Sequence, residues 1–177
     1  MGGVSLPKKV KLFCGIIFSS FKKKVKQKSL SILEYNFGKI DLLSSVIPFN
    51  FSNYYNSEIG DDLRRFWISF EKLVFTSDLV ETKIFTNYVE NSFLTNNKRL
   101  INIDPGYVTP ANVILATTKD FSHRIYLSNG IYGEVTVIYK NGRFIKLPWS
   151  YTDYLSESAI DFFLRVRENL VKQLRQS

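Results

Sequence analysis

Residues 10 to 18, VKLFCGIIF, form a short and almost wholly apolar run near the start of the chain. The run is partly β-branched and far shorter than the ~18 residues that a membrane-spanning helix needs, which predicts a buried strand. Directly after it, residues 22 to 38 place apolar side chains at helical spacing and end in Gly38, a common helix stop. The chain is therefore expected to begin with a strand followed by a helix.

The next segments continue this alternation of strands and helices. Residues 39 to 49 predict a second strand, and residues 62 to 75 alternate apolar and polar side chains as a half-buried third strand does. A helix is expected over residues 76 to 96, followed by a short fourth strand over residues 99 to 103. This order, β-α-β-β-α-β, is that of a ferredoxin-like unit.

The C-terminal part of the chain predicts one more helix, a meander and a last helix. Thr109 followed by Pro110 is typical of a helix start and predicts a helix over residues 111 to 118. A final helix is expected from Ser156 or Ser158 to about Leu174. The strands of an antiparallel meander are expected over residues 123–127, 131–139 and 143–147. The whole chain, 1–177, is therefore expected to be one α+β domain, a ferredoxin-like unit extended by a C-terminal antiparallel meander and a terminal helix.

Basic residues are concentrated near the N-terminus. Eight lysines precede the first acidic residue, Glu34, and their number equals the net charge of +8. Such a patch can attract nucleic acid, an acidic partner or an anionic membrane surface. Because neither aromatic residues nor arginines are interleaved with the lysines, a solvated helix face is the favoured interpretation. Any nucleic-acid contact is expected to be weak and to involve Lys22, Lys23, Lys24 and Lys26.

Standard catalytic and nucleotide-binding motifs are absent from the sequence. It contains no glycine-rich phosphate loop ending in Lys-Ser or Lys-Thr, no G-x-G-x-x-G and no G-x-S-x-G. One histidine and one cysteine exclude metal motifs built from paired ligands of either type, and the sequence indicates no particular cofactor. The lone Cys14 forms no intramolecular disulfide, which fits a reducing cytoplasm.

Polar and titratable residues are concentrated between residues 102 and 134. The candidates for proton transfer are Asp104, Asp120, His123 and Glu134. Structural alternatives remain open for them. Asp-Pro-Gly is mainly a turn signal, a lone histidine is often a hydrogen-bonded structural residue, and an acid in mid-strand can face solvent.

Basic and aromatic residues supply the candidate ligand contacts. Lys119 and Arg124 predict a clamp for phosphate or carboxylate, with solvated charge as the alternative. On a strand, His123 and Arg124 would face opposite sides and need not converge. Tyr126, Trp149 and Asp153 complete the candidate ligand-binding set.

Two segments share one sequence pattern. PFNFSNY at residues 48 to 54 and PWSYTDY at residues 148 to 154 each follow an expected strand and precede a polar turn. The segments are too short to indicate a duplication, and chance or shared turn chemistry is the favoured explanation. Whether the two loops meet around one pocket is left open.

Several motifs together resemble one protein family. Through NIDPGY, ATTKDFSHRIYL, GIYGEVTVIY and LPWSYTDY, the chain resembles the DUF4416 family of bacterial and archaeal proteins over nearly its whole length. Some members are labelled GTP-binding proteins, but nothing in this sequence supports a phosphate-loop basis for that label. The family pattern is matched by residues 104–106, 119–120, 123–124 and 149–154, whereas the lysine-rich first helix departs from the mixed or acidic composition expected there. The resemblance implies a family and a domain boundary, and no mechanism.

Three functions are compatible with the sequence. The preferred expectation is a domain that binds an anionic small molecule, such as a nucleotide or phosphometabolite, or an enzyme acting on one. The alternatives are an RNA- or protein-binding module that uses the lysine-rich helix, and a structural protein without a site.

Overall fold

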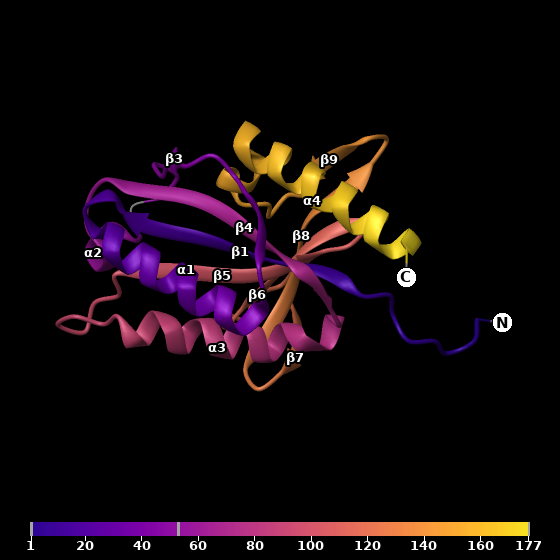
Figure 1. Cartoon of the computed structure of the whole chain (residues 1–177), viewed down its shortest axis with the longest axis horizontal. Coiled ribbons are helices and arrows are strands. Elements are labelled where there is room, and N and C mark those ends of the chain that lie inside the picture. The colour runs from indigo at the N-terminus through magenta and orange to yellow at the C-terminus, as the bar shows by residue number, and fades with distance from the viewer. Residues whose placement is uncertain (1, 53, 177) are drawn as a thin grey trace.

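One antiparallel sheet organises the molecule (Figure 1), and the computed structural model describes residues 2–52 and 54–176. Within them, seven strands follow the order β2-β4-β1-β5-β6-β8-β7, while β3 pairs with β4 and β9 pairs with β8. The strands are β1 (Val10–Ser19), β2 (Ile40–Leu43), β3 (Ile47–Pro48), β4 (Leu63–Val74), β5 (Ile101–Val108), β6 (Asn112–Thr117), β7 (Ile125–Ser128), β8 (Ile131–Lys140) and β9 (Arg143–Lys146). The predicted α+β class is confirmed. The C-terminal strands are antiparallel as expected, but they do not form a simple meander, because β7 and β9 both pair with the edge of β8 that lies opposite β6.

Helices cover both faces of the sheet. The α-helices are α1 (Lys23–Phe37), α2 (Asn56–Ile59), α3 (Leu79–Ser92) and α4 (Glu157–Gln176), with short 3₁₀ turns η1 (Ser20–Lys22), η2 (Thr76–Asp78) and η3 (Thr152–Leu155). Figure 1 shows α1 and α3 on one side and α4 on the other. Leu33 of α1 and Val89 of α3 belong to one buried cluster, and Phe163 of α4 belongs to a second. Within the described residues, no helix is both long and apolar enough to cross a membrane.

Strand β4 contributes to both of these clusters. Phe66, Ile68 and Phe70 pack beneath α1 and α3, whereas Trp67 packs beneath α4. The prediction of a half-buried strand is therefore wrong, because the C-terminal helix returns to cover the face that the sequence assigns to solvent. The predicted strand over residues 39–49 is also divided in two, as β2 and β3.

The predicted helix over residues 111–118 is a strand, β6. Thr109 does behave as a cap, because its Oγ1 accepts hydrogen bonds from the backbone N–H groups of Ala111 and Asn112. The chain then leaves as a strand, in which Val113 is fully buried and pairs with Val137 of β8. Tertiary pairing has overridden a local helix signal.

Asp104, Pro105 and Gly106 lie inside β5, so the predicted turn at these residues is also wrong. Pro105 is tolerated there because Ile103 directs its N–H and C=O away from β1, toward side chains of α3. Backbone groups two residues apart on a strand point to the same edge, so the nitrogen of Pro105 faces α3, as the N–H of Ile103 does. Among the described residues no strand pairs with this edge, so the missing N–H of proline breaks no strand pairing.

The sheet divides between β5 and β6. Only Gly106, Tyr107 and Val108 of β5 pair with β6, so no strand among the described residues pairs with residues 101–105 on that edge. Gly106 permits this close approach, because a Cβ atom there would overlap the carbonyl oxygen of Ile114 and the Phe13 ring. The space opened by this division is where the candidate site lies.

Candidate functional site

A pocket of about 600 Å³ occupies the region where β6 diverges from β5. Its walls come from the end of β6 and the residues that follow it, from β8, from α3, and from two loops at residues 49–55 and 149–154. The volume lies within the ~300–1,000 Å³ range typical of small-molecule sites.

The two segments of similar sequence meet around this pocket. Phe49, Phe51 and Tyr54 line it from the first loop, and Trp149 and Tyr151 line it from the second. Asn53, the counterpart of Asp153 in the shared pattern, lies outside the described residues. The structure thus answers the question that the sequence leaves open about the position of these loops.

Arg65 forms the charged floor of the pocket. This residue of β4 is 1% exposed, its Nε lies 3.2 Å from Oδ2 of Asp153, and its Nη2 donates to the Tyr154 hydroxyl at 2.9 Å. Its Nη1 lies 3.7 Å from Oδ2 of Asp104. Burial alone would lower the pKa of Arg65, but Tyr154, Asp153 and Asp104 outweigh it and raise the pKa. Arg65 is therefore a permanent cation between two carboxyl groups.

Asp104 lies between cations and a donating amide. Its Oδ1 lies 3.4 Å from Nζ of Lys83, and its Oδ2 accepts a hydrogen bond from Nδ2 of Asn102 at 2.6 Å. Burial alone would raise the pKa of Asp104, but Lys83, Arg65 and the Asn102 hydrogen bond lower it overall. Asp104 is thus an ionised carboxylate at neutral pH, whereas burial raises the pKa of Asp153 despite its contact with Arg65.

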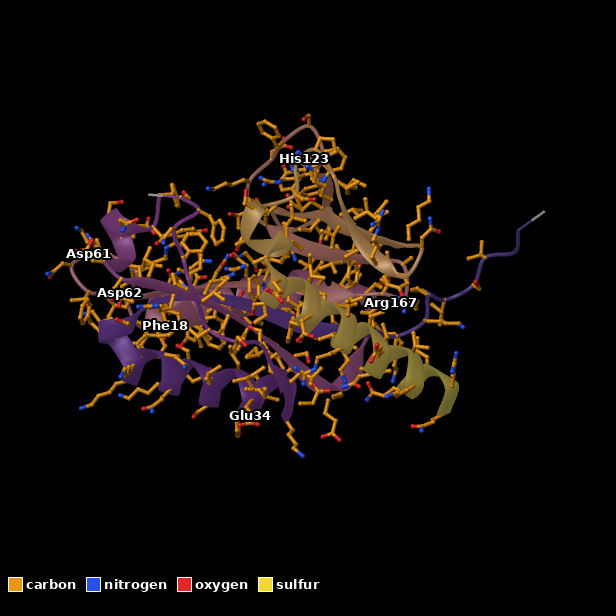
Figure 2. The ribbon with its side chains drawn as sticks, turned by 90° about the horizontal axis from the view of Figure 1, so that it is seen from above. Phe18, Glu34, Asp61, Asp62, His123 and Arg167 are labelled. Atoms are coloured by element: carbon orange, nitrogen blue, oxygen red, sulfur yellow. The ribbon has the colours of Figure 1, made fainter. Side chains whose placement is uncertain are left out.

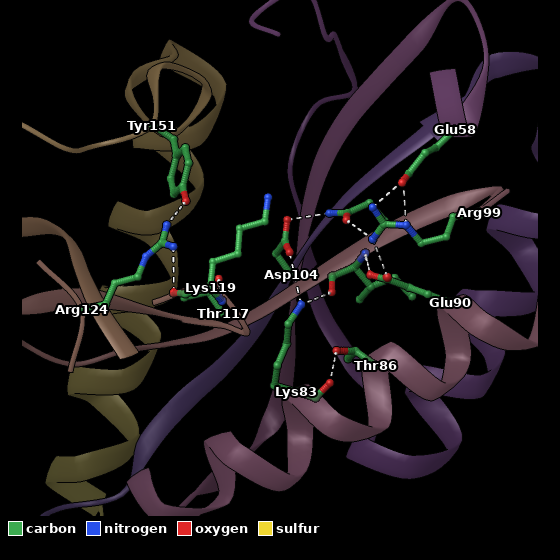
Figure 3. Close-up of polar contacts among 12 residues, drawn as sticks. Glu58, Lys83, Thr86, Glu90, Arg99, Asp104, Thr117, Lys119, Arg124 and Tyr151 are labelled. Carbon is green, nitrogen blue, oxygen red and sulfur yellow. Dashed lines mark hydrogen bonds and ion pairs between the residues drawn. The ribbon is translucent and has the colours of Figure 1, made fainter. Parts of the chain in front are cut away.

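A polar stripe on α3 faces the open edge of β5 (Figure 3). Nζ of Lys83 donates to the Ile103 carbonyl at 3.4 Å, and the Ile103 N–H donates to Oε1 of Glu90 at 2.5 Å. Oε2 of Glu90 accepts from Nη1 of Arg99 at 2.9 Å, and Arg99 also pairs with Glu58. Burial raises the pKa of Glu90, although Lys83 and Arg99 oppose this. The stripe satisfies buried backbone groups and extends the ion-pair network across the pocket.

Glu134 of β8 anchors a second polar cluster. Its Oε2 accepts from Nε of Arg124 at 2.7 Å and lies 3.2 Å from Nε2 of His123. The sequence leaves open whether His123 and Arg124 converge. They do, because β7 begins only at Ile125 and not at residue 123 as predicted, and the preceding turn lets both side chains reach one carboxylate. Oε1 of Glu134, by contrast, is buried and has no hydrogen-bond partner among the described residues.

Arg124 and His123 hold the pocket walls together from outside it. Arg124 donates to the Lys119 carbonyl at 2.9 Å and to the Tyr151 hydroxyl at 2.8 Å. The His123 ring stacks on Trp149 with centroids 5.1 Å apart. Figure 2 shows His123 on the opposite side of the molecule from Glu34 of α1. His123 and Arg124 thus position residues that line the pocket, and neither lines it.

Lys119 is the distinctive cation of the pocket. Its Nζ lies 4.5 Å from the centroid of the Tyr54 ring, and among the described residues it makes no ion pair with a carboxylate. Figure 3 shows its side chain in an extended conformation. The residue is exposed while it lines the pocket, which places it at the mouth.

The candidates from the sequence therefore divide into three groups. Asp104, Lys119, Glu134, Trp149 and Asp153 line the pocket. His123 and Arg124 contact Glu134 behind it, as described above. Asp120 is exposed and Tyr126, 58% exposed, packs against Tyr132, and neither of them lines the pocket.

Sequence reasoning missed much of the buried charge. On β4, Arg65 belongs to the set of positions that alternates with the apolar Phe66 and Ile68, and that pattern predicts that Arg65 faces solvent, whereas it is buried. Lys83, Thr86 and Glu90 recur at helical spacing on α3, all buried, and this polar stripe is the signal that could have indicated a polar surface beneath the helix. Within the described residues, no group of three or more His, Cys, Asp or Glu side chains is arranged to hold a metal ion.

The lysine-rich segment lies on other elements. Lys22, Lys23 and Lys24 are exposed at the start of α1, and none of them lines the pocket. Lys26 is partly buried, with its Nζ 5.1 Å from the Phe18 ring and 5.0 Å from the Phe66 ring. Any role of these lysines is thus separate from the pocket.

Fold and pocket together define an α+β protein whose divided antiparallel sheet contains an aromatic-lined pocket of mixed charge. The chain belongs to the family described as Domain of unknown function (DUF4416), whose sequence model matches residues 8–170. This confirms the resemblance that the motifs indicate. Searches of curated proteins and of solved structures find no match to the chain.

Proposed function

We propose that this protein binds an anionic small molecule, such as a nucleotide or a phosphometabolite, in the pocket between the 49–55 and 149–154 loops. The proposal depends on one observation about Lys119. This cation lies at the pocket mouth above the Tyr54 ring and has no carboxylate partner among the described residues. An unpaired ammonium beside aromatic surfaces suits an anionic group attached to a planar ring.

The chemistry of the pocket also supports an enzyme acting on such a ligand. Asp104 is ionised and suits a base or an electrostatic anchor, whereas Asp153 has a raised pKa because it is buried. Two carboxyl groups whose pKa values are shifted apart form a recurrent arrangement for acid–base chemistry. Binding is the primary proposal, and turnover would use these two residues.

The test is a thermal-shift screen of the purified chain against nucleotides and phosphorylated metabolites. A ligand at a hundred times its dissociation constant stabilises a protein by about 2.7 kcal/mol, which is readily measured. We expect at least one compound to raise the melting temperature of the wild type and of Lys140→Ala, an exposed control, but not of Lys119→Ala. A screen without any hit, or a hit that Lys119→Ala retains, contradicts the proposal.

A second candidate function is weak nucleic-acid binding at the start of α1. It is favoured by three consecutive exposed lysines, Lys22 to Lys24, beside Phe21, which is 78% exposed. Binding through these groups and Lys26 would fall steeply with salt. Failure of the protein to retain short RNA at low salt would exclude this candidate.

We further infer that β1, α1, β2, β4, α3 and β5 form a ferredoxin-like unit. The strand order β2-β4-β1-β5 with antiparallel neighbours, and the position of α1 and α3 on one face, support this. A cytoplasmic location is also proposed, because Cys14 is buried and unpaired.

A further inference from the structure

Apart from Lys119, the charged side chains that the structure describes around the pocket carry no excess of positive charge. The four cations of the ion-pair network, Arg65, Lys83, Arg99 and Arg124, each contact at least one carboxylate, and together they face five carboxylates. A ligand with several phosphates would bring charges that the network does not neutralise. Among the described residues that line the pocket, Lys119 is the one cation without a carboxylate partner, so it is available to neutralise an incoming anionic group.

Glu134 provides a second unsatisfied group in the same pocket. The residue is 2% exposed and lines the cavity, and its Oε1 has no hydrogen-bond partner among the described residues. Leaving a buried carboxylate oxygen unpaired is costly, and a donor supplied by a ligand would relieve that cost.

The two groups differ in depth. Lys119 is exposed at the mouth, whereas Glu134 lines the pocket and is buried. Aromatic residues such as Tyr54 and Trp149 line the space that a ligand would occupy. A molecule that satisfies both groups has its anionic end outside and a donor on the inner end of its ring.

We propose that the ligand carries one anionic group, a phosphate monoester or a carboxylate held by Lys119, and a planar ring whose N–H or O–H group donates to Oε1 of Glu134. This inference rests on the proposed function. It narrows the range of expected ligands to molecules with one anionic group, and a polyphosphate is not expected to be the preferred ligand. Phosphate and carboxylate share the chemistry that Lys119 requires, so the experiment includes both.

The first test compares ligands on the wild-type protein by calorimetry, without added metal. The probes are nucleosides, their 5′-monophosphates, their 5′-triphosphates, and orotate as a planar heterocyclic carboxylate. We expect a monophosphate or orotate to bind at least tenfold more tightly than an uncharged nucleoside, and triphosphates to bind no more tightly than monophosphates. Triphosphates that bind more tightly overturn the inference but leave the proposed function standing. If none of the probes binds, the inference fails, and the proposed function stands only if a phosphorylated metabolite raises the melting temperature in the wider screen.

The second test exchanges the acceptor at Glu134 for a donor. Nε of Arg124 can only donate, so in Glu134→Gln the amide oxygen stays at the Oε2 position and the NH₂ group takes the Oε1 position. The contact with Arg124 is thereby kept, while the ligand meets a donor instead of an acceptor. We expect at least a tenfold loss of affinity for the probe that binds best, and no loss in Glu168→Gln, an exposed control on α4. Unchanged affinity in Glu134→Gln, with the fold intact by circular dichroism, overturns the assignment.

Discussion

The guanidinium group of Arg65 occupies the space that a side chain at Gly15 would fill. A Cβ atom on Gly15 would lie 2.5 Å from Nη2 of Arg65 and 2.9 Å from the Tyr154 hydroxyl. Gly15 lies on β1 between its pairing partners Trp67 and Asp104, so it provides the opening through which Arg65 approaches both Asp104 and Tyr154. The ion-pair floor of the pocket thus depends on the absence of one methyl group.

Gly15→Ala is expected to lower the free energy of unfolding by about 1–3 kcal/mol, the usual cost of overpacking. Arg65 is fully buried and bound to Asp153, so it cannot move aside freely. Chemical denaturation measures the effect. The control is Gly133→Ala on β8, where the nearest atom is the partly exposed Leu127 side-chain end at 3.3 Å. An equal loss in both variants would contradict the explanation.

Asp104 is expected to make stability depend on pH in the acid range. Its pKa in the folded state lies below the usual 3.8, because Lys83 and Arg65 outweigh the effect of burial. A group with a lowered folded-state pKa contributes stability above its unfolded-state pKa and loses it as the pH falls through the folded-state value.

Asp104→Asn should therefore reduce the free energy of unfolding by about 2 kcal/mol at pH 7, and the difference from wild type should shrink below pH 3.8. Denaturation of both proteins over a pH series tests this. Burial raises the pKa values of Glu90 and Asp153, and the charge of Asp104 raises both further, so the difference between the two profiles reports Asp104 together with its effect on these two carboxyl groups. Asp161→Asn, an exposed control, should show no such pH-dependent gap.

His123→Ala is expected to lower stability and to leave ligand affinity nearly unchanged, whereas Lys119→Ala is expected to do the reverse. His123 contacts Glu134 and stacks on Trp149, so its loss should cost about 1–2 kcal/mol of stability while ligand affinity falls little. The Lys119 side chain lies at the mouth, and its backbone contacts with Arg124 and Thr117 survive truncation. Its loss should change stability by less than about 0.5 kcal/mol and should abolish binding. Melting temperatures measured with and without ligand separate the two effects, and the reverse pattern would contradict these roles.

The lysines of the first helix are expected to differ in their contribution to stability. Lys26 lies over the Phe18 and Phe66 rings, and Lys26→Gln should cost about 0.5–1 kcal/mol. The triple replacement of the exposed Lys22, Lys23 and Lys24 by Gln should leave thermal stability nearly unchanged. If these lysines bind RNA, the triple variant should lose retention on a filter at low salt. A triple variant less stable than Lys26→Gln would contradict the distinction.

Most elements of the fold could be predicted from local patterns. Apolar spacing and glycine stops indicate β1, α1, α3 and α4 at nearly their observed positions. The strand β6 could not be predicted, because a short apolar run after Thr-Pro fits a helix as well as a strand, and only pairing with β8 decides. In the same way, Pro105 and Gly106 are usual turn residues, and their strand position depends on distant neighbours, α3 and Ile114.

The pocket was predictable only in part. Lys119, Glu134 and Trp149 stand in polar or aromatic motifs near turns, where sites commonly occur, and the structure places them in one cavity. Arg65 and Lys83 carry no such signal, since a charged residue on an alternating strand or on a helix is normally solvated. Their burial follows from α4 and α3 packing over the sheet, which no local pattern encodes.

The contacts of α3 with Ile103 explain why there is room for a pocket at all. A sheet edge normally requires another strand to satisfy its backbone, and that strand would fill the adjoining space. Here Lys83 donates to the carbonyl of Ile103 and Glu90 accepts from its N–H, so two side chains replace the backbone of a missing strand. The volume that this strand would have taken contributes to the pocket, which Lys83, Asn102 and Asp104 line.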